Sequence, residues 1–105
     1  MSGLIITTPE TAPKVAFNLD GRIMFSSEKI ELIHLTLQPG EKMELHSQPV
    51  DVVFYVISGN GILDFEGQSV NGPQGTCIHV PAGMQRGWKN NGPAEFRGLV
   101  VKDMK

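Results

Sequence analysis

The sequence predicts a single all-β domain, built from short strands that form a sandwich or a barrel. The chain has 105 residues, which is the usual size of one domain. Its 12 glycines and 7 prolines supply turn signals along the whole chain. These signals recur about every 8–12 residues, the spacing typical of all-β sandwiches and barrels. No heptad pattern or solenoid-length repeat competes with that interpretation.

The N-terminal part of the chain carries weaker strand signals than the rest. Residues 4–8 are compatible with a short strand that pairs outside its own barrel, until Pro9 interrupts regular structure. Residues 15–18 and 22–26 form a candidate hairpin around the turn signal Asp20-Gly21.

We place the start of the barrel at the first long strand candidate, residues 29–38. Both faces of this segment would carry large apolar side chains if it is a strand. Pro39-Gly40 ends the run. A helix is the rival interpretation, but the β-branched content favours a strand. We therefore expect residues 1–28 to pack on the barrel or on a dimer partner, and residues 29–105 to form the barrel.

The central part of the chain has the clearest strand signal. Residues 51–57, D-V-V-F-Y-V-I, form a near-continuous apolar run, which is typical of a strand buried on both faces. The turn Ser58-Gly59-Asn60-Gly61 then predicts a hairpin with residues 62–66. Further strands are expected at residues 43–47, 76–80, 85–89 and 94–102, with a brief one around Val70.

Composition and charge exclude several classes of function. The formal net charge is −2, so the chain lacks the basic footprint of a nucleic-acid-binding protein. No stretch approaches the ~20 apolar residues of a membrane-spanning helix. The N-terminus lacks the pattern of a signal peptide, so we expect a cytoplasmic protein without membrane contact. The single cysteine, Cys77, excludes an internal disulfide and is expected to be a small buried side chain.

Two stretches are expected to form the walls of one small pocket. Residues 40–59 read G-E-K-M-E-L-H-S-Q-P-V-D-V-V-F-Y-V-I-S-G, and residues 75–90 read G-T-C-I-H-V-P-A-G-M-Q-R-G-W-K-N. They resemble the two motifs of the cupins, which are small double-sheet barrels of the jelly-roll type. The first cupin motif runs glycine, five residues, His-x-His, three or four residues, Glu, six residues, glycine. The second runs glycine, five residues, Pro-x-Gly, two residues, His, three residues, Asn.

The spacing of both motifs is kept in this chain. Gly40, His46 and Gly59 keep the frame of the first motif, while Gly75 and Asn90 bound the second around Pro-Ala-Gly. The resemblance covers about two-thirds of the chain. It implies a single-domain, all-β, cupin-type jelly-roll barrel, also called a double-stranded β-helix.

The metal-ligand positions of the motifs are altered. In cupins the two His, the Glu and the later His usually bind a divalent metal. Here only His46 is unchanged, because Gln48, Val52 and Arg86 occupy the other three positions. Valine has no donor atom, and arginine is a permanent cation. The resemblance therefore implies a largely lost metal site, and no metal cofactor is expected.

Two other histidines leave one alternative open. If His34 or His79 points into the barrel, it would complete a new site with His46, and a divalent metal could then bind. Lone histidines are more often structural residues than ligands.

Arg86 changes what the pocket is expected to hold. If the frame is kept, its guanidinium reaches the barrel interior, where an unpaired charge is costly. A bound carboxylate, phosphate or sulfate would supply the missing acceptor, and His46 and Gln48 would add hydrogen bonds. Phe54 and Trp88 would form an apolar wall. Three of these residues also have a structural alternative. The Arg86 side chain could lean out into solvent, Gln48 could hydrogen-bond to a loop carbonyl, and Trp88 could simply pack in the core.

Three classes of function follow from these residues. The favoured one is a protein that binds a small, anionic molecule without a metal. The second is a small cupin enzyme, such as an isomerase, lyase or dioxygenase acting on a sugar acid or another carboxylate. There His46 would act as general base, with or without a metal. The third is a ligand-free accessory scaffold. Sheet edges need covering, so a homodimer is expected in each case.

Overall fold

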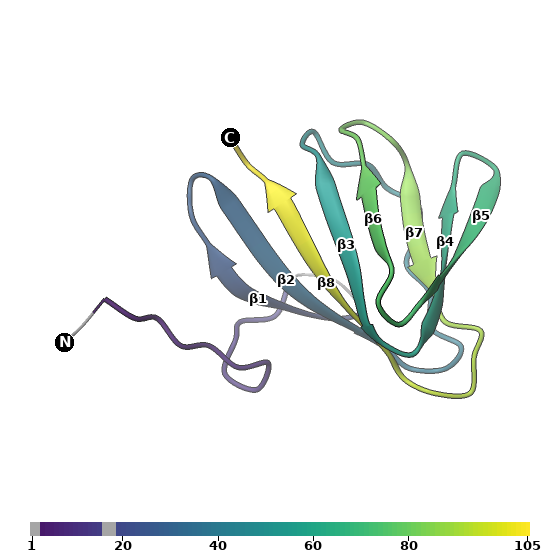
Figure 1. Ribbon diagram of the computed structural model, residues 1–105, viewed down its shortest axis with the longest axis horizontal. Coiled ribbons are helices and arrows are strands. Elements are labelled where there is room, and N and C mark those ends of the chain that lie inside the picture. Colours follow the sequence, from purple (N-terminus) through teal and green to yellow (C-terminus); the bar gives the residue numbers. More distant parts are fainter. Residues whose placement is uncertain (1–2, 16–18) are drawn as a thin grey trace.

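The computed structural model describes residues 3–15 and 19–105, and this part of the chain is an all-β barrel. Figure 1 shows its strands. They are β1 (Asp20–Ser26), β2 (Ile30–Leu37), β3 (Val52–Ser58), β4 (Asn60–Phe65), β5 (Gln68–Pro73), β6 (Cys77–Val80), β7 (Arg86–Lys89) and β8 (Phe96–Asp103). The described residues contain no helix, and so none that is long and apolar enough to cross a membrane. The all-β prediction is confirmed.

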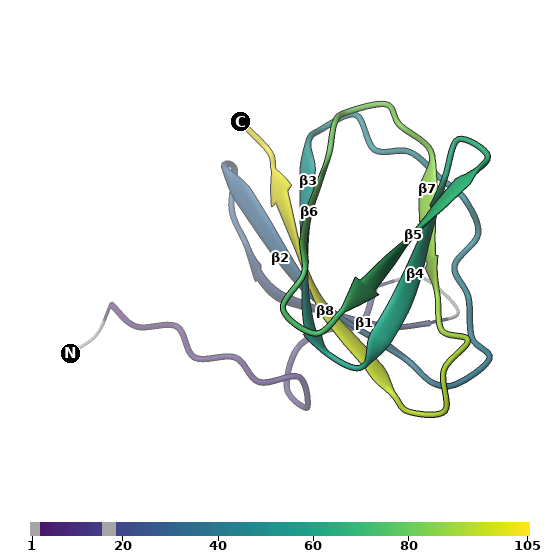
Figure 2. The same cartoon turned by 45° about the vertical axis from the view of Figure 1, so that its right-hand side comes forward.

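The strands form two antiparallel sheets that face each other across the interior (Figure 2). The larger sheet has the order β1-β2-β8-β3-β6, and the smaller has the order β5-β4-β7. Strand β1 pairs with β2 over most of its length. The boundary predicted between residues 28 and 29 therefore falls in the loop that joins these two strands.

The predicted hairpin between residues 51–57 and 62–66 is wrong. Strand β3 lies in the larger sheet, between β8 and β6, and β4 lies in the smaller one. At Gly59 the chain passes from one sheet to the other, with a φ of 83° that favours glycine. A Cβ there would also overlap the backbone of Glu95 and Phe96.

One further strand prediction and one turn prediction do not hold, whereas the strand predicted at residues 22–26 lies within β1. Residues 43–47 form no strand, and the segment touches β7 only through the isolated bridges Lys42↔Lys89 and His46↔Arg86. Asp20-Gly21 is not a turn, because β1 begins at Asp20. Of the predicted strand at residues 15–18, only Val15 is within the described part of the chain.

Residues 3–8 extend away from the barrel without forming a strand (Figures 1 and 2). A local turn anchors this segment to the body, because the amides of Thr11 and Ala12 both donate to the Thr8 carbonyl, at 3.0 and 2.9 Å. Ala12 itself is buried, with 4% of its surface exposed. The chain then joins the larger sheet, where the Val15 amide donates to the Gly21 carbonyl at 2.8 Å.

The core lies between the two sheets, where alternate side chains of each strand point inward. Trp88 is at its centre, 1% exposed, with its ring edge-on to Phe54 at 5.6 Å and tilted against Phe96 at 4.9 Å. Gly61 and Gly72 lie opposite each other on β4 and β5, and a Cβ on either would collide with the Trp88 ring. The other buried apolar residues are Ile33, Leu35, Leu37, Val52, Val56, Leu63, Val80 and Val100.

Candidate functional site

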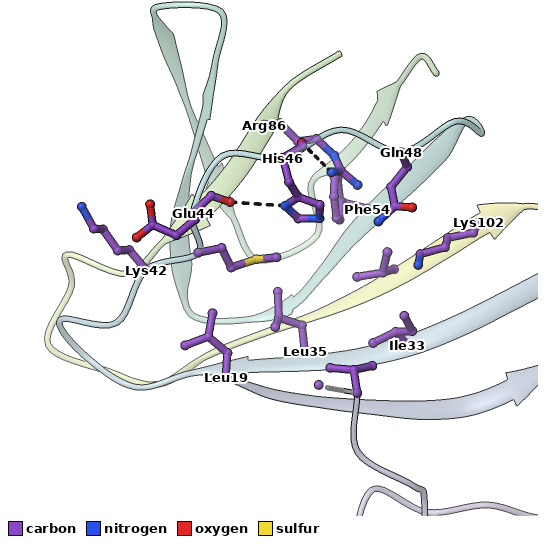
Figure 3. Close-up of a pocket in the computed structure, with 14 residues that line it drawn as sticks. Leu19, Ile33, Leu35, Lys42, Glu44, His46, Gln48, Phe54, Arg86 and Lys102 are labelled. Atoms are coloured by element: carbon purple, nitrogen blue, oxygen red, sulfur yellow. Dashed lines mark hydrogen bonds between the residues drawn. The ribbon is translucent and has the colours of Figure 1, made fainter. Parts of the chain in front are cut away.

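A pocket of about 250 Å³ lies inside the barrel and has two chemically different sides (Figure 3). His46, Gln48 and Arg86 are on one side, together with the rim residues Lys42 and Glu44. The apolar lining includes Val15, Leu19, Ile33, Leu35, Phe54 and Val100. Such a combination of a few polar groups with apolar walls is usual for a small-molecule site.

Backbone pairing brings His46 and Arg86 together. The His46 amide donates to the Arg86 carbonyl at 3.1 Å, and the Arg86 amide donates to the His46 carbonyl at 2.9 Å. Gly87 permits this close approach, because a Cβ there would lie 2.8 Å from the Met43 carbonyl oxygen. The segment around His46 is thus held against β7 although it forms no strand.

Arg86 is a buried cation whose charge no carboxylate balances. Its residue is 3% exposed. One guanidinium nitrogen donates to the His46 carbonyl at 2.9 Å, and the guanidinium carbon lies 5.6 Å from the centre of the Phe54 ring. Among the described residues, none of the ion pairs includes Arg86. Burial away from water lowers the pKa of this guanidinium.

His46 lines the same pocket, and its ring is held in a defined orientation. Its Nδ1 lies 3.2 Å from the Glu44 carbonyl oxygen. A carbonyl only accepts hydrogen bonds, so Nδ1 carries the proton and Nε2 is the basic nitrogen of the neutral ring. Burial lowers the pKa of this imidazole, and the Arg86 charge lowers it further, although the bond to Glu44 opposes both. The neutral form is therefore favoured at pH 7.

The remaining predicted ligand contacts are divided between pocket and core. Gln48 and Phe54 line the pocket. The main-chain carbonyl of Gln48 accepts a hydrogen bond from the main-chain amide of Gly83 at 2.8 Å. Trp88 is not among the lining residues, and its packing between two rings matches the structural alternative.

The other two histidines do not approach His46. His34 lies between Ile33 and Leu35 on β2; those two neighbours line the pocket, so its side chain is on the opposite face. His79 is exposed on β6, and its Nε2 lies 3.2 Å from a carboxylate oxygen of Asp51. The alternative in which either completes a site with His46 has no support in this arrangement.

The residues at the positions that usually bind a metal in the cupin motifs do not fit a metal ion. Val52 is a core residue with 1% exposure, and Arg86 brings a positive charge to the same cavity. In the part of the chain that the structure describes, no three His, Cys, Asp or Glu side chains gather as a possible ligand set. One imidazole and one amide fall short of the three protein ligands that a catalytic zinc site uses.

Sequence reasoning did not identify Lys102 as a pocket residue. It lines the pocket from β8, and its amine lies 3.4 Å from a carboxylate oxygen of Glu31 on β2. The signal was present, because alternation from the buried Phe96 through Val100 brings Lys102 to the inner face. A lysine at the end of an apolar run is easily taken for a surface residue.

Comparisons with known proteins agree with this architecture. The sequence matches the family model of the cupin domain over residues 33–102. An RmlC-like cupin family protein from Methanocaldococcus jannaschii has a TM-score of 0.80 at 23% identity, covering 98% of this chain and 92% of that one. A conserved protein with a double-stranded β-helix domain from Klebsiella pneumoniae has a TM-score of 0.83 at 18% identity, covering 97% and 90%.

A third solved structure is an enzyme. The polyketide cyclase RemF from Streptomyces resistomycificus has a TM-score of 0.73 at 20% identity, covering 81% of this chain and 64% of that one. At such identities these structures show a shared fold only. No curated protein matches the sequence. Since the family match spans more than half of the chain and the fold agrees with it, the chain belongs to the cupin family.

Proposed function

We propose that this cupin binds a small carboxylate with an apolar body, and that Arg86 anchors the carboxylate. The observation that carries the proposal is a guanidinium that is 3% exposed, lines the pocket and has no carboxylate partner among the described residues. A buried charge of this kind normally has a partner of opposite sign. A ligand carboxylate would supply one, through the paired hydrogen bonds that arginine favours.

The other cations of the pocket have their charge compensated or hydrated. Lys102 is paired with Glu31, and Lys42 is exposed to water. Arg86 is neither. The opposite wall is made of aliphatic side chains from β2 and its neighbours, among them Ile33 and Leu35, so the rest of the ligand would be apolar (Figure 3).

A thermal-shift experiment with matched ligands tests this proposal. Hexanoate and benzoate are compared with hexanamide and benzamide, which have similar shapes but no charge. A carboxylate at about 100 times its Kd should raise the melting temperature by roughly 10 °C, and the amides should raise it far less. Arg86→Gln should abolish the carboxylate shift, whereas Lys42→Gln, at the exposed rim of the same pocket, should keep it.

Two results would contradict the proposal. One is an equal shift with carboxylate and amide, which would mean that charge is not recognised. The other is an Arg86→Gln variant that remains folded and keeps the full shift. If no anion in a wider panel of carboxylates, phosphate and sulfate produces a shift, the ligand-free scaffold is the better description.

A second candidate function is a proton-transfer enzyme acting on such a carboxylate. The observation that favours it is the neutral His46 imidazole, with Nε2 as its basic nitrogen, in the same pocket as Arg86. His46 would take a proton from the carbon next to a carbonyl, and Arg86 would stabilise the negative charge of the resulting enolate. Return of the proton to a different carbon would complete an isomerisation.

Deuterium exchange distinguishes the enzyme from the binding protein. With 2-oxobutanoate in D2O, an enzyme should exchange the C3 protons faster than buffer alone, as followed by NMR. His46→Gln should reduce the protein-dependent rate by about 100-fold or more while the thermal shift persists. Exchange no faster than in buffer would leave the binding function alone.

A further inference from the structure

The pocket contains a second half-buried cation, Lys102, which comes from the other sheet. Lys102 is on β8 in the larger sheet, whereas Arg86 is on β7 in the smaller one, and both line the pocket. Figure 3 shows the Lys102 side chain at the end of the pocket where Gln48 lies, away from Lys42. Besides burial, the charges of Arg86 and Lys102 both lower the pKa of His46, so both cations act on the same space around the imidazole.

Strand register explains why a lysine reaches this position. Lys102 is opposite Glu31 on β2 and opposite Val52 on β3. It follows Val100, which lines the pocket, by two residues, and Glu31 precedes the pocket residue Ile33 by two. Residues two apart on a strand share a face, so Lys102 and Glu31 both lie on the inner face of the larger sheet.

The pair with Glu31 balances the charge of Lys102 but leaves most of its hydrogen-bonding capacity unused. The amine lies 3.4 Å from one Glu31 oxygen, and the other oxygen accepts a hydrogen bond from the Ser26 hydroxyl at 3.1 Å. Glu31 is the only ion-pair partner that Lys102 has among the described residues. An ammonium group has three N–H donors, so at least two remain for water or a ligand.

The charges of the pocket limit what the second anchor can bind. Arg86 and Lys102 bring two positive charges, and Glu31 brings one negative charge. Lys42 and Glu44 at the rim are opposite in sign and exposed, so they add no net charge. One carboxylate on Arg86 would therefore neutralise the pocket. A second negative group would leave a half-buried charge without compensation, which is costly. The remaining donors of Lys102 suit a neutral oxygen.

We propose that the pocket selects oxo acids, in which a ketone oxygen accepts a hydrogen bond from Lys102 while the carboxylate binds Arg86. This inference rests on the proposed function and adds to it a residue that determines specificity. The apolar walls, among them Ile33 and Leu35, would cover the carbon chain of the acid. A hydrogen bond from a charged donor to the ketone should lower the Kd by about 10-fold or more.

Calorimetric titration of the wild type tests the choice of ligand. Hexanoate is compared with 2-oxo-, 4-oxo- and 5-oxohexanoate, and 2-methyl-, 4-methyl- and 5-methylhexanoate match their shapes without the oxygen. At least one oxo acid should bind about 10-fold or more tightly than its methyl counterpart. Adipate, which has a second carboxylate, should bind less tightly than that oxo acid. The proposal is overturned if no oxo acid exceeds its counterpart, or if adipate binds most tightly.

Two variants assign the selectivity to Lys102. Glu31→Gln/Lys102→Met removes one charge of each sign, so the net charge of the pocket is kept while the amine is lost. The ratio of the two Kd values, methyl acid over oxo acid, should fall to near one. In Lys42→Met, which removes a lysine from the exposed rim, the ratio should stay high. A high ratio in the double variant would contradict the assignment.

Glu31→Gln alone provides an independent check, because Glu31 is not among the residues that line the pocket. It leaves the Lys102 charge uncompensated, so adipate should bind about 10-fold or more tightly than it binds the wild type. An unchanged adipate Kd would mean that Lys102 does not reach the ligand. If hexanoate binds through Arg86 but the ketone adds nothing, this inference alone fails. If no carboxylate of the panel binds, the proposed function fails with it.

Discussion

Arg86 and Asn90 are both buried polar residues of one short stretch, but their side chains are satisfied in different ways. The side-chain Nδ2 of Asn90 donates to the carbonyls of Leu37 and Ala94 at 3.0 and 2.9 Å. Its side-chain Oδ1 accepts a hydrogen bond from the Gly92 amide at 2.9 Å. Its partners are all backbone groups, so its role is structural. The Arg86 guanidinium has five N–H donors, and its side-chain hydrogen bond is to one acceptor, the His46 carbonyl. This contrast is why we propose that Arg86 anchors the ligand.

Also at the residue scale, the lowered pKa of His46 predicts that the stability of the folded protein depends on pH. The fold lowers the His46 pKa, mainly by burial and then by the Arg86 charge, so protons bind the unfolded chain more readily. The free energy of unfolding should therefore be unaffected by His46 well above pH 6.5 and should fall as the pH drops below it. Urea denaturation of wild type and His46→Gln from pH 8 to about pH 5 should show a smaller decrease in the variant.

NMR titration of the imidazole provides the direct check. The His46 ring should titrate below its ordinary pKa in the wild type. In Arg86→Gln its pKa should rise, because a neighbouring positive charge has been removed. An unchanged His46 pKa in that variant would mean that the two side chains do not interact electrostatically, and would weaken the proposed site.

At the scale of elements, the site depends on β7 being shared between two partners. On one side β7 pairs with β4, and on the other it meets the segment that carries His46. The smaller sheet therefore positions Arg86 while the loop positions His46. The packing of the smaller sheet depends on Trp88 from β7, whose ring covers Gly61 and Gly72 of the adjacent hairpin.

This packing predicts that the smaller sheet is sensitive to substitutions that add an atom next to Trp88. In Gly72→Ala the new Cβ would lie 2.7 Å from the Trp88 ring, so the ring must shift. We expect a loss of about 1–3 kcal/mol in the free energy of unfolding, measured by urea denaturation. Gly98→Ala is the control, because Gly98 is also buried in a strand but its Cβ would meet its nearest atom at 3.4 Å. Equal losses in both variants would show that the contact with Trp88 is not the cause.

At the scale of the whole molecule, the larger sheet separates the pocket from the outer surface. Alternate residues of β8 point to opposite sides, so Val100 lines the pocket while Leu99 and Val101 point to the outer side of the sheet.

Local patterns in the sequence were sufficient for much of the fold. Alternation and turn residues predicted the strands that became β2, β3, β4, β6, β7 and β8 to within a few residues. The cupin frame predicted that His46 and Arg86 would meet, although 40 positions separate them. The hairpin after β3 failed because a turn signal does not specify which sheet receives the next strand.

The sequence by itself determined the all-β class, the cupin frame and which residues stand at the motif's ligand positions, because each depends on residue type and spacing along the chain. Only the tertiary structure decided that Arg86 has no carboxylate partner among the described residues, that Lys102 has one, and that Trp88 packs in the core. It also decided that Cys77, Tyr55 and Ile57 are exposed, whereas a buried Cys77 was expected from the sequence. These properties depend on what lies opposite a side chain in space, and residues distant in sequence supply that environment.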